Sequence, residues 1–330
     1  MANFLFVNGQ IRALESKLLT TQRLDRMVGA ATPQDAFRIL VELQYAEYVD
    51  DTVTAQDFTK IIERGLLETK ELIIKGTNNN QGLQFLWARF DLNNLKRAYK
   101  LKLLQEKTEL GEFTEENGFS LLGNLSPEEI TSLVFNQSIP ENLPEEYLEV
   151  IKSIEESEGN KEFRLIEFAL DKAYFAYLNK AARKSGSVFL KKLWKMLVDT
   201  TNLRSLARSI LVLEEALPKE AFIEGGEVRW LDTENIKNLD FISSTPFAEI
   251  LEGINDNDAS EEKLMKVEKA LDLAYKRFLG DASQGEISSI QVPLAYFERR
   301  LQNSRMIKLI MFAKFHGLKP EQIYQILKQF

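Results

Sequence analysis

The sequence predicts an almost entirely α-helical protein built from three related units. Two observations support this prediction. Helix-forming residues dominate the chain, which has only 8 Pro and 16 Gly among 330 residues, and apolar residues recur at the three- and four-residue spacing of one helix face. One short polar motif also occurs twice, each time inside such an apolar pattern, and repeats of this kind indicate an array of similar units.

The repeated motif is an apolar residue, then Asp-x-x-Asn-Leu, then a base. Its copies are Phe90-Asp91-Leu92-Asn93-Asn94-Leu95-Lys96 and Val198-Asp199-Thr200-Thr201-Asn202-Leu203-Arg204. Asp and Asn three residues apart share a helix face. Polar groups inside an apolar helical seam need partners. We therefore predict that the structural polar pairs Asp91–Asn94 and Asp199–Asn202 find partners at helix crossings or at the pseudo-symmetric centre of the repeats. A simple crossing of two helices would also explain one pair alone.

A second repeated string supports the division into units. Ala169-Leu170-Asp171-x-Ala173-Tyr174 precedes the second motif, and Ala270-Leu271-Asp272-x-Ala274-Tyr275 precedes a diverged third copy. In that third copy Glu298 replaces the Asp and Leu301 replaces the Asn. Three units of roughly 105 residues follow. We place them at 1–115, 116–220 and 221–330.

The first unit opens with three predicted helices. Phe4, Val7, Ile11, Leu14 and Leu18 form one apolar seam, which predicts a helix over 3–19. A second helix is expected over 22–28, ended by a glycine. Thr32-Pro33-Gln34-Asp35 combines an N-cap, a proline at the first helical position and an acid near the positive helix end, so a third helix should follow over 36–42.

Start and turn signals recur later in the chain. Ser126-Pro127-Glu128-Glu129 repeats the start signal before a helix, and Thr233-Glu234-Asn235 is a weaker version without proline. The glycine-rich stretches 76–82, 185–187 and 280–285 each separate two long helical patterns. Each unit therefore contains a helix, a loop and a second helix that carries the Asp or Glu. Residues 222–228 are predicted to form a tight turn.

The composition excludes several function classes. Without cysteine there is no disulfide, thiolate or Cys-ligated metal, and the single His316 leaves no histidine cluster for a metal. No base, nucleophile or ligand spacing accompanies the carboxylates, so we expect no catalytic residue, no cofactor and no metal. All three units are acidic, which disfavours nucleic acid as a partner. No apolar run is long enough to cross a bilayer, so a soluble, cytoplasmic protein is expected.

Charge is unevenly distributed in the middle unit. Residues 141–162 hold eight Glu against two Lys, whereas 180–195 hold six bases and no acid. Both stretches could be solvated surface. Alternatively, the basic stretch is a docking surface for an acidic partner.

The motifs, in this order and spacing, resemble the C subunit (named d in some members) of the rotary V/A-type ATPases. The resemblance covers almost the whole chain and rests on five segments: 8–19, 90–96, 197–204, Phe222-Ile223-Glu224-Gly225-Gly226, and 298–309. The chain departs from the family at Glu224, where a proline often stands, and at the third copy, where Asp-x-x-Asn is lost.

The resemblance implies three similar helical bundles around a pseudo-threefold axis, which together form a hollow funnel. It also implies a non-catalytic rotor coupler that seats the central-shaft subunits, rests on the membrane proteolipid ring and transmits torque for ion transport. As a member of such a complex, the chain would be peripheral to the membrane. An all-α repeat adaptor that binds another protein in a concave face remains the alternative.

Bases on the second helix of each unit are the candidate partner contacts, because those helices can face a common axis. An acidic or dipolar shaft end would attract them. Outward, solvated positions would explain them equally well. The candidates are Lys96, Arg97, Arg204, Arg208, Arg305 and Lys308.

Overall fold

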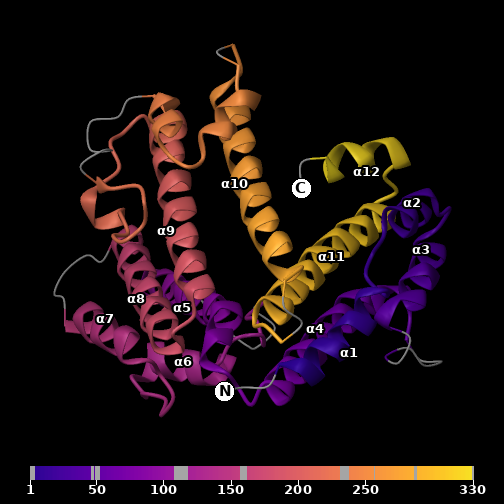
Figure 1. Ribbon diagram of the computed structural model, residues 1–330, viewed down its shortest axis with the longest axis horizontal. Coiled ribbons are helices and arrows are strands. Elements are labelled where there is room, and N and C mark those ends of the chain that lie inside the picture. Colours follow the sequence, from indigo (N-terminus) through magenta and orange to yellow (C-terminus); the bar gives the residue numbers. More distant parts are fainter. Residues whose placement is uncertain are drawn as a thin grey trace. The chain divides into compact units, whose positions relative to one another are not determined.

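The computed structural model is helical, as Figure 1 shows. It describes residues 4–45, 48, 53–107, 118–156, 162–230, 238–255, 257–285 and 288–328. These residues form helices and turns and contain no β-strand, so the all-α prediction is confirmed. Contacts divide the chain into two compact units, one made of residues 1–83 with 277–330 and the other of 84–276.

The unit of residues 1–83 and 277–330 joins the two ends of the chain. Its helices α3, α4 and α1 all pack on α11, and α12 packs on α2. The buried Val7, Ile62 and Ile310 belong to its core. The helices are α1 (Leu5–Glu15), α2 (Thr21–Gly29), α3 (Pro33–Leu40), α4 (Phe58–Gly76), α11 (Gln291–Phe315) and α12 (Pro320–Leu327), together with the last turns of α10 (Ser260–Ser283).

The unit of residues 84–276 is built around α8, which packs against α5, α7 and α9. A second cluster of this unit lies further along α9, where Leu203 and Leu206 pack with Val267 and Leu271 of α10. The helices are α5 (Gln84–Lys107), α6 (Pro127–Asn136), α7 (Glu145–Glu156), α8 (Phe163–Ser185) and α9 (Val188–Arg208), with the first part of α10.

Two of the predicted helix starts are confirmed. Thr32 accepts a hydrogen bond from the Asp35 N–H at the start of α3. Ser126 and Glu129 form a reciprocal capping box at the start of α6. The weaker signal at 233–235 lies outside the described residues, as does the expected boundary between 115 and 116.

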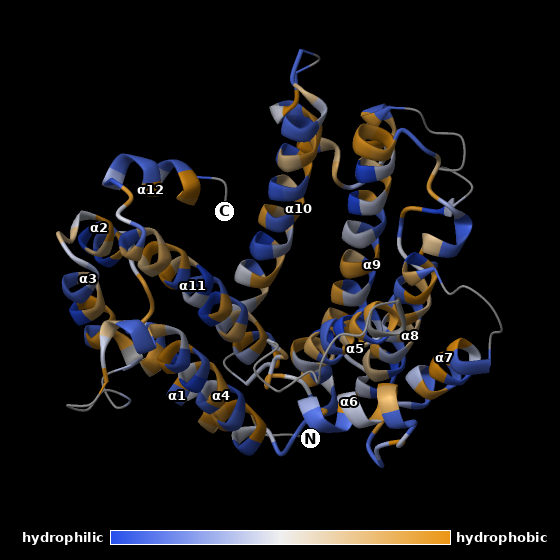
Figure 2. Ribbon diagram, turned by 180° about the vertical axis from the view of Figure 1, so that it is seen from behind, coloured by the Kyte–Doolittle hydropathy of each residue, from blue (hydrophilic) through white to orange (hydrophobic). Residues whose placement is uncertain are grey.

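The helix–loop–helix order predicted for each unit is present in the chain, as α4 then α5, α8 then α9, and α10 then α11. In Figure 2, orange and blue residues lie side by side along these helices, as expected where one face is buried. The division into three repeats at 1–115, 116–220 and 221–330 stays a prediction.

Candidate functional site

The first motif, on α5, holds a turn that lies more than twenty residues further along the chain. Asn94 Nδ2 donates to the Ser120 carbonyl at 2.8 Å, and the Ser120 N–H donates to Asn94 Oδ1 at 2.9 Å. The Asp91 carboxylate accepts from the Leu125 N–H at 3.0 Å and from Asn124 Nδ2 at 2.8 Å. Two side chains of one helix thus fix both ends of the turn 120–125.

The second motif, on α9, does the same to the turn 223–228. Asn202 Nδ2 donates to the Ile223 carbonyl at 2.8 Å and Oδ1 accepts from the Ile223 N–H at 3.0 Å. Asp199 accepts from the N–H groups of Glu227 and Val228 at 3.0 and 2.9 Å. We call each arrangement an Asp–Asn clamp, meaning the motif Asp and Asn with the turn that they hold.

Glycine is required at the same place in both clamps. A Cβ on Gly123 would lie 2.2 Å from Asp91 Oδ1, and a Cβ on Gly226 would lie 2.0 Å from Asp199 Oδ1. The carboxylate occupies the space in which any larger residue would place its side chain. The turn register therefore repeats as Phe-x-x-x-Gly-x-apolar, in 119–125 and again in 222–228.

The sequence predicted the turn 222–228 but not its counterpart at 119–125. The partners of the polar pairs were expected at helix crossings or at the pseudo-symmetric centre, whereas the structure has them in these turns. The signal was available, because Phe119, Gly123 and Leu125 share the spacing of Phe222, Gly226 and Val228. The residues between these positions differ, so a search for identical sequences does not reveal the relation between the two turns.

Burial sets the electrostatics of the second clamp. Asp199 and Asn202 are buried. Desolvation raises the pKa of the Asp199 carboxyl above its ordinary value, although the two N–H groups that bond to it oppose the rise. The carboxylate thus exchanges water for fixed backbone donors. This geometry positions a backbone segment and includes no group arranged to attack a substrate.

The base that ends each motif pairs with an acid on another long helix. Lys96 pairs with Asp171 of α8 at 2.7 Å, and Arg204 pairs with Asp272 of α10. Both acids come from the repeated Ala-Leu-Asp-x-Ala-Tyr string. Burial raises the pKa of Asp171, and the nearby Lys96 ammonium opposes that rise. The two repeated strings recognised in the sequence are thus partners of each other in space.

Comparison with known proteins adds an independent observation. The sequence matches the family described as ATP synthase (C/AC39) subunit over residues 7–326. The chain belongs to this family. It is similar to the C subunit of the A-type ATP synthase of Desulfurococcus sp. (strain SY), at 25% identity over 98% of this chain and 90% of that protein. Proteins of the same name from Thermococcus kodakarensis and Methanocaldococcus jannaschii are 24% and 22% identical, over 98% and 99% of this chain and 90% and 86% of their own lengths.

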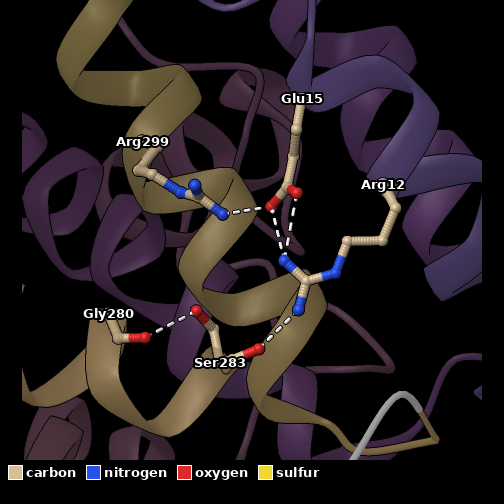
Figure 3. Close-up of polar contacts among 5 residues, drawn as sticks. All are labelled: Arg12, Glu15, Gly280, Ser283 and Arg299. Carbon is tan, nitrogen blue, oxygen red and sulfur yellow. Dashed lines mark hydrogen bonds and ion pairs between the residues drawn. The ribbon is translucent and has the colours of Figure 1, made fainter. Parts of the chain in front are cut away.

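In this member of the C/AC39 family the diverged third copy, on α11, makes different contacts. Leu301 is buried where the clamps have Asn, and Glu298 is half-buried. Figure 3 shows the polar network beside it: Glu15 of α1 accepts from Arg12 and from Arg299, and Arg12 also donates to the Ser283 carbonyl at the end of α10. Arg299, next to Glu298 in the third copy, therefore joins α11 to α1 through Glu15.

A buried arginine was missed by the sequence analysis. Arg300 of α11 donates to the Tyr45 hydroxyl at 3.1 Å and to the Gly65 carbonyl at 3.4 Å, and its guanidinium lies 5.0 Å from the Tyr45 ring centroid. A Cβ on Gly65 would lie 2.8 Å from Tyr45 Cε1. Nothing in the local sequence separates Arg300 from the neighbouring Arg299, whose side chain is 44% exposed.

The six candidate contact bases have different surroundings. In addition to the ion pairs of Lys96 and Arg204 described above, Arg208 pairs with Glu268 at 3.0 Å and Lys308 pairs with Glu63 at 2.9 Å. Arg97 lies over the Phe119 ring at 5.8 Å. Arg305 is exposed and makes no ion pair with the described residues. Four of the six thus bind a carboxylate of a neighbouring helix.

In the part of the chain that the structure describes, no three His, Cys, Asp or Glu residues are grouped as a metal site would require. None of the described helices combines the length and apolar character that a bilayer crossing requires.

Proposed function

We propose that this C/AC39 family member is a non-catalytic rotor coupler of an A-type ATP synthase, peripheral to the membrane on the cytoplasmic side. It seats the central shaft, links it to the proteolipid ring and transmits torque for ion transport. The family match and the names of the relatives support membership of such a complex. The observation that carries the coupling role is the repeated linkage made by the Asp–Asn clamps.

A coupler must resist shear, and the linkage provides this resistance. Each clamp ties a long helix to the turn that follows it, and the next base ties the same helix to the first helix of the following repeat. Packed helices cross-linked by oriented polar contacts transmit strain because the protein interior is close-packed and has low compressibility. A catalytic protein would instead need reactive groups facing a cavity.

The pairing of the helices also supports three related repeats. The second helix of the first repeat, α5, packs on α8, and the second helix of the second repeat, α9, packs on α10. The second helix of the third repeat, α11, packs on α4, the first helix of the first repeat. Each of these second helices packs on the first helix of another repeat, and this pattern supports the proposal of three related repeats.

The shaft contact remains part of the proposal at residue level. Arg97 and Arg305, which lack an ion pair with the described residues, are the candidates most able to reach a partner. The paired bases Lys96, Arg204, Arg208 and Lys308 would contact it only at the expense of their internal carboxylates. Charge reversal at Arg305 should weaken binding to the isolated shaft at low salt more than at high salt.

The test is reconstitution of the ATP synthase with and without this chain. With the chain absent, ATP hydrolysis by the catalytic part should persist while ATP-driven ion transport into vesicles is lost, and adding the purified chain should restore transport. Pull-down of the tagged chain should recover shaft and ring subunits. Full transport without the chain, or recovery of an unrelated protein alone, would reject the coupler in favour of a repeat adaptor.

A further inference from the structure

The turn between α8 and α9 concentrates positive charge in an acidic protein. Between Asp171 and Asp199 the chain has seven bases and no acid, although its net charge is −8. Four of these bases flank the turn within ten residues and are exposed: Arg183, Lys184, Lys191 and Lys192. We call these four, with the turn 185–188, the basic tip.

The bases of the tip differ from those further along the same helices. Lys180 pairs with Glu145 and Glu146 of α7, and Lys195 pairs with Glu227. Among the described residues, the Arg183 guanidinium donates only to the Asn179 side-chain oxygen, at 3.2 Å. The four tip bases form no ion pair with any residue that the structure describes. Their charge is therefore available to an external anion.

The tip is held rigidly. Gly186 has a φ of +69°, which ends α8 in a left-handed conformation, and its N–H donates to the Arg183 carbonyl. The Ser187 hydroxyl caps α9 by accepting from the Leu190 N–H. Deeper in the hairpin, Trp194 Nε1 donates to the Phe175 carbonyl at 2.9 Å. The tip bases are therefore presented from a fixed backbone.

One exposed aliphatic residue accompanies the charge. Val188, the first residue of α9, is 67% exposed and stands between the two pairs of bases. A shallow hollow of about 560 Å³ runs along α8 beside the tip, lined by Ala176, Asn179, Lys180, Arg183 and Lys184. It is open to solvent, and no acid lines it.

From these observations we propose that the basic tip binds the surface of a membrane that contains anionic lipids. Three of the four bases are lysines, which act as flexible point charges and suit a diffuse layer of phosphates better than a planar carboxylate site. A protein partner would need a broad interface with an apolar centre, and the tip offers only Val188. The inference does not depend on the proposed coupler role.

The test is co-sedimentation of the full chain with vesicles of phosphatidylcholine alone or with about 30% phosphatidylglycerol, at about 0.05 M and 0.5 M salt. We expect binding only to the anionic vesicles at low salt. Each lysine near an anionic surface contributes about fivefold to the partition constant. The triple variant Lys184→Gln, Lys191→Gln, Lys192→Gln should therefore bind about a hundredfold more weakly.

A matched control carries the same change in net charge elsewhere. Lys17, Lys152 and Lys219 are exposed and lie outside the tip, and their triple change to Gln should leave binding within about twofold. Replacing the three tip lysines with Arg should retain binding. Circular dichroism and thermal unfolding of each variant show that it is folded.

Three results would overturn the proposal: no binding of the wild-type chain to anionic vesicles, an equal loss in the control triple, or equal binding by the tip triple. If vesicles do not bind but the tip triple loses affinity for a purified protein of the complex, the tip is a protein interface. If the chain binds anionic vesicles but does not restore transport in the reconstituted synthase, membrane binding by the basic tip is supported and only the proposed coupler function is rejected.

Discussion

The clamps on α5 and α9 use the same side chains but differ in their access to water. In the α9 clamp, the hydrogen bonds between Asn202 and Ile223 are buried, and Phe222 and Val228 on either side belong to a hydrophobic core. The equivalent bonds between Asn94 and Ser120 are only partly buried. The two clamps thus share the same hydrogen-bond geometry, but their hydrogen bonds should contribute differently to the free energy of unfolding. Losing a hydrogen bond is costly only where water cannot replace the lost partner.

The largest expected effect separates the two clamps directly. Asn202→Ala leaves the buried N–H and carbonyl of Ile223 without partners. Each unsatisfied group costs about 1–3 kcal/mol, so the free energy of unfolding should fall by about 2–6 kcal/mol. Asn94→Ala should cost about half as much, because water reaches Ser120. Urea unfolding followed by circular dichroism measures both, and the exposed Asn93→Ala on α5 is the control. An equal loss of unfolding free energy in Asn202→Ala and Asn94→Ala would show that burial does not decide how much each clamp contributes to stability.

The second prediction tests the glycine shared by the clamps. Gly226→Ala places a Cβ 2.0 Å from the Asp199 carboxylate. The turn or the carboxylate must move, and overpacking of this kind costs about 1–3 kcal/mol. Gly123→Ala should behave similarly. Gly9→Ala is the matched control, since no atom lies within 4 Å of its Cβ and the change in helix α1 should stabilise by up to about 1 kcal/mol. If thermal unfolding shows that Gly226→Ala is as stable as Gly9→Ala, glycine is not sterically required at position 226.

The comparison also shows what could be predicted from the sequence. The helices, their start signals and the polar positions Asp91, Asn94, Asp199 and Asn202 follow from periodicity and repetition, which are local in the chain. The partners do not, because a clamp needs only a backbone N–H and carbonyl, and any residue supplies these. Only the glycine that makes room for the carboxylate can be recognised in the sequence as part of the clamp. The burial of Arg300 cannot be recognised in this way, because its partners Tyr45 and Gly65 lie far away in the chain.

The third prediction uses the pKa of Asp199, which burial raises. A group with a raised pKa in the folded state adds stability below its ordinary pKa, and this contribution is lost as the pH rises through the higher folded value. The free energy of unfolding of the wild type minus that of Asp199→Asn should therefore fall between about pH 4 and neutrality. Urea titrations at several pH values measure this difference.

Neighbouring charges sharpen that test. Glu227 raises the pKa of Asp199 and Lys195 lowers it. In a Glu227→Gln background the folded-state pKa of Asp199 should be lower, so the fall of the same difference should be smaller and should end at a lower pH. A difference that rises with pH would mean that the backbone N–H donors of Glu227 and Val228 outweigh desolvation at this clamp.

The smallest expected effect concerns the ion pairs made by the base that ends each motif. Lys96 and Asp171 have side chains that are only 21% and 24% exposed, whereas Arg204 and Asp272 are 38% and 56% exposed. Solvent and salt screen the second pair more strongly, and exposed pairs contribute about 0.2–1 kcal/mol. In double-mutant cycles with Lys96→Met and Asp171→Asn, and with Arg204→Met and Asp272→Asn, the coupling energy should be larger for the first pair. At about 1 M salt the second coupling should vanish while part of the first persists. If both coupling energies vanish together, the two ion pairs are equally exposed to solvent. Burial would then distinguish the α5 and α9 clamps only through the hydrogen bonds to their turns.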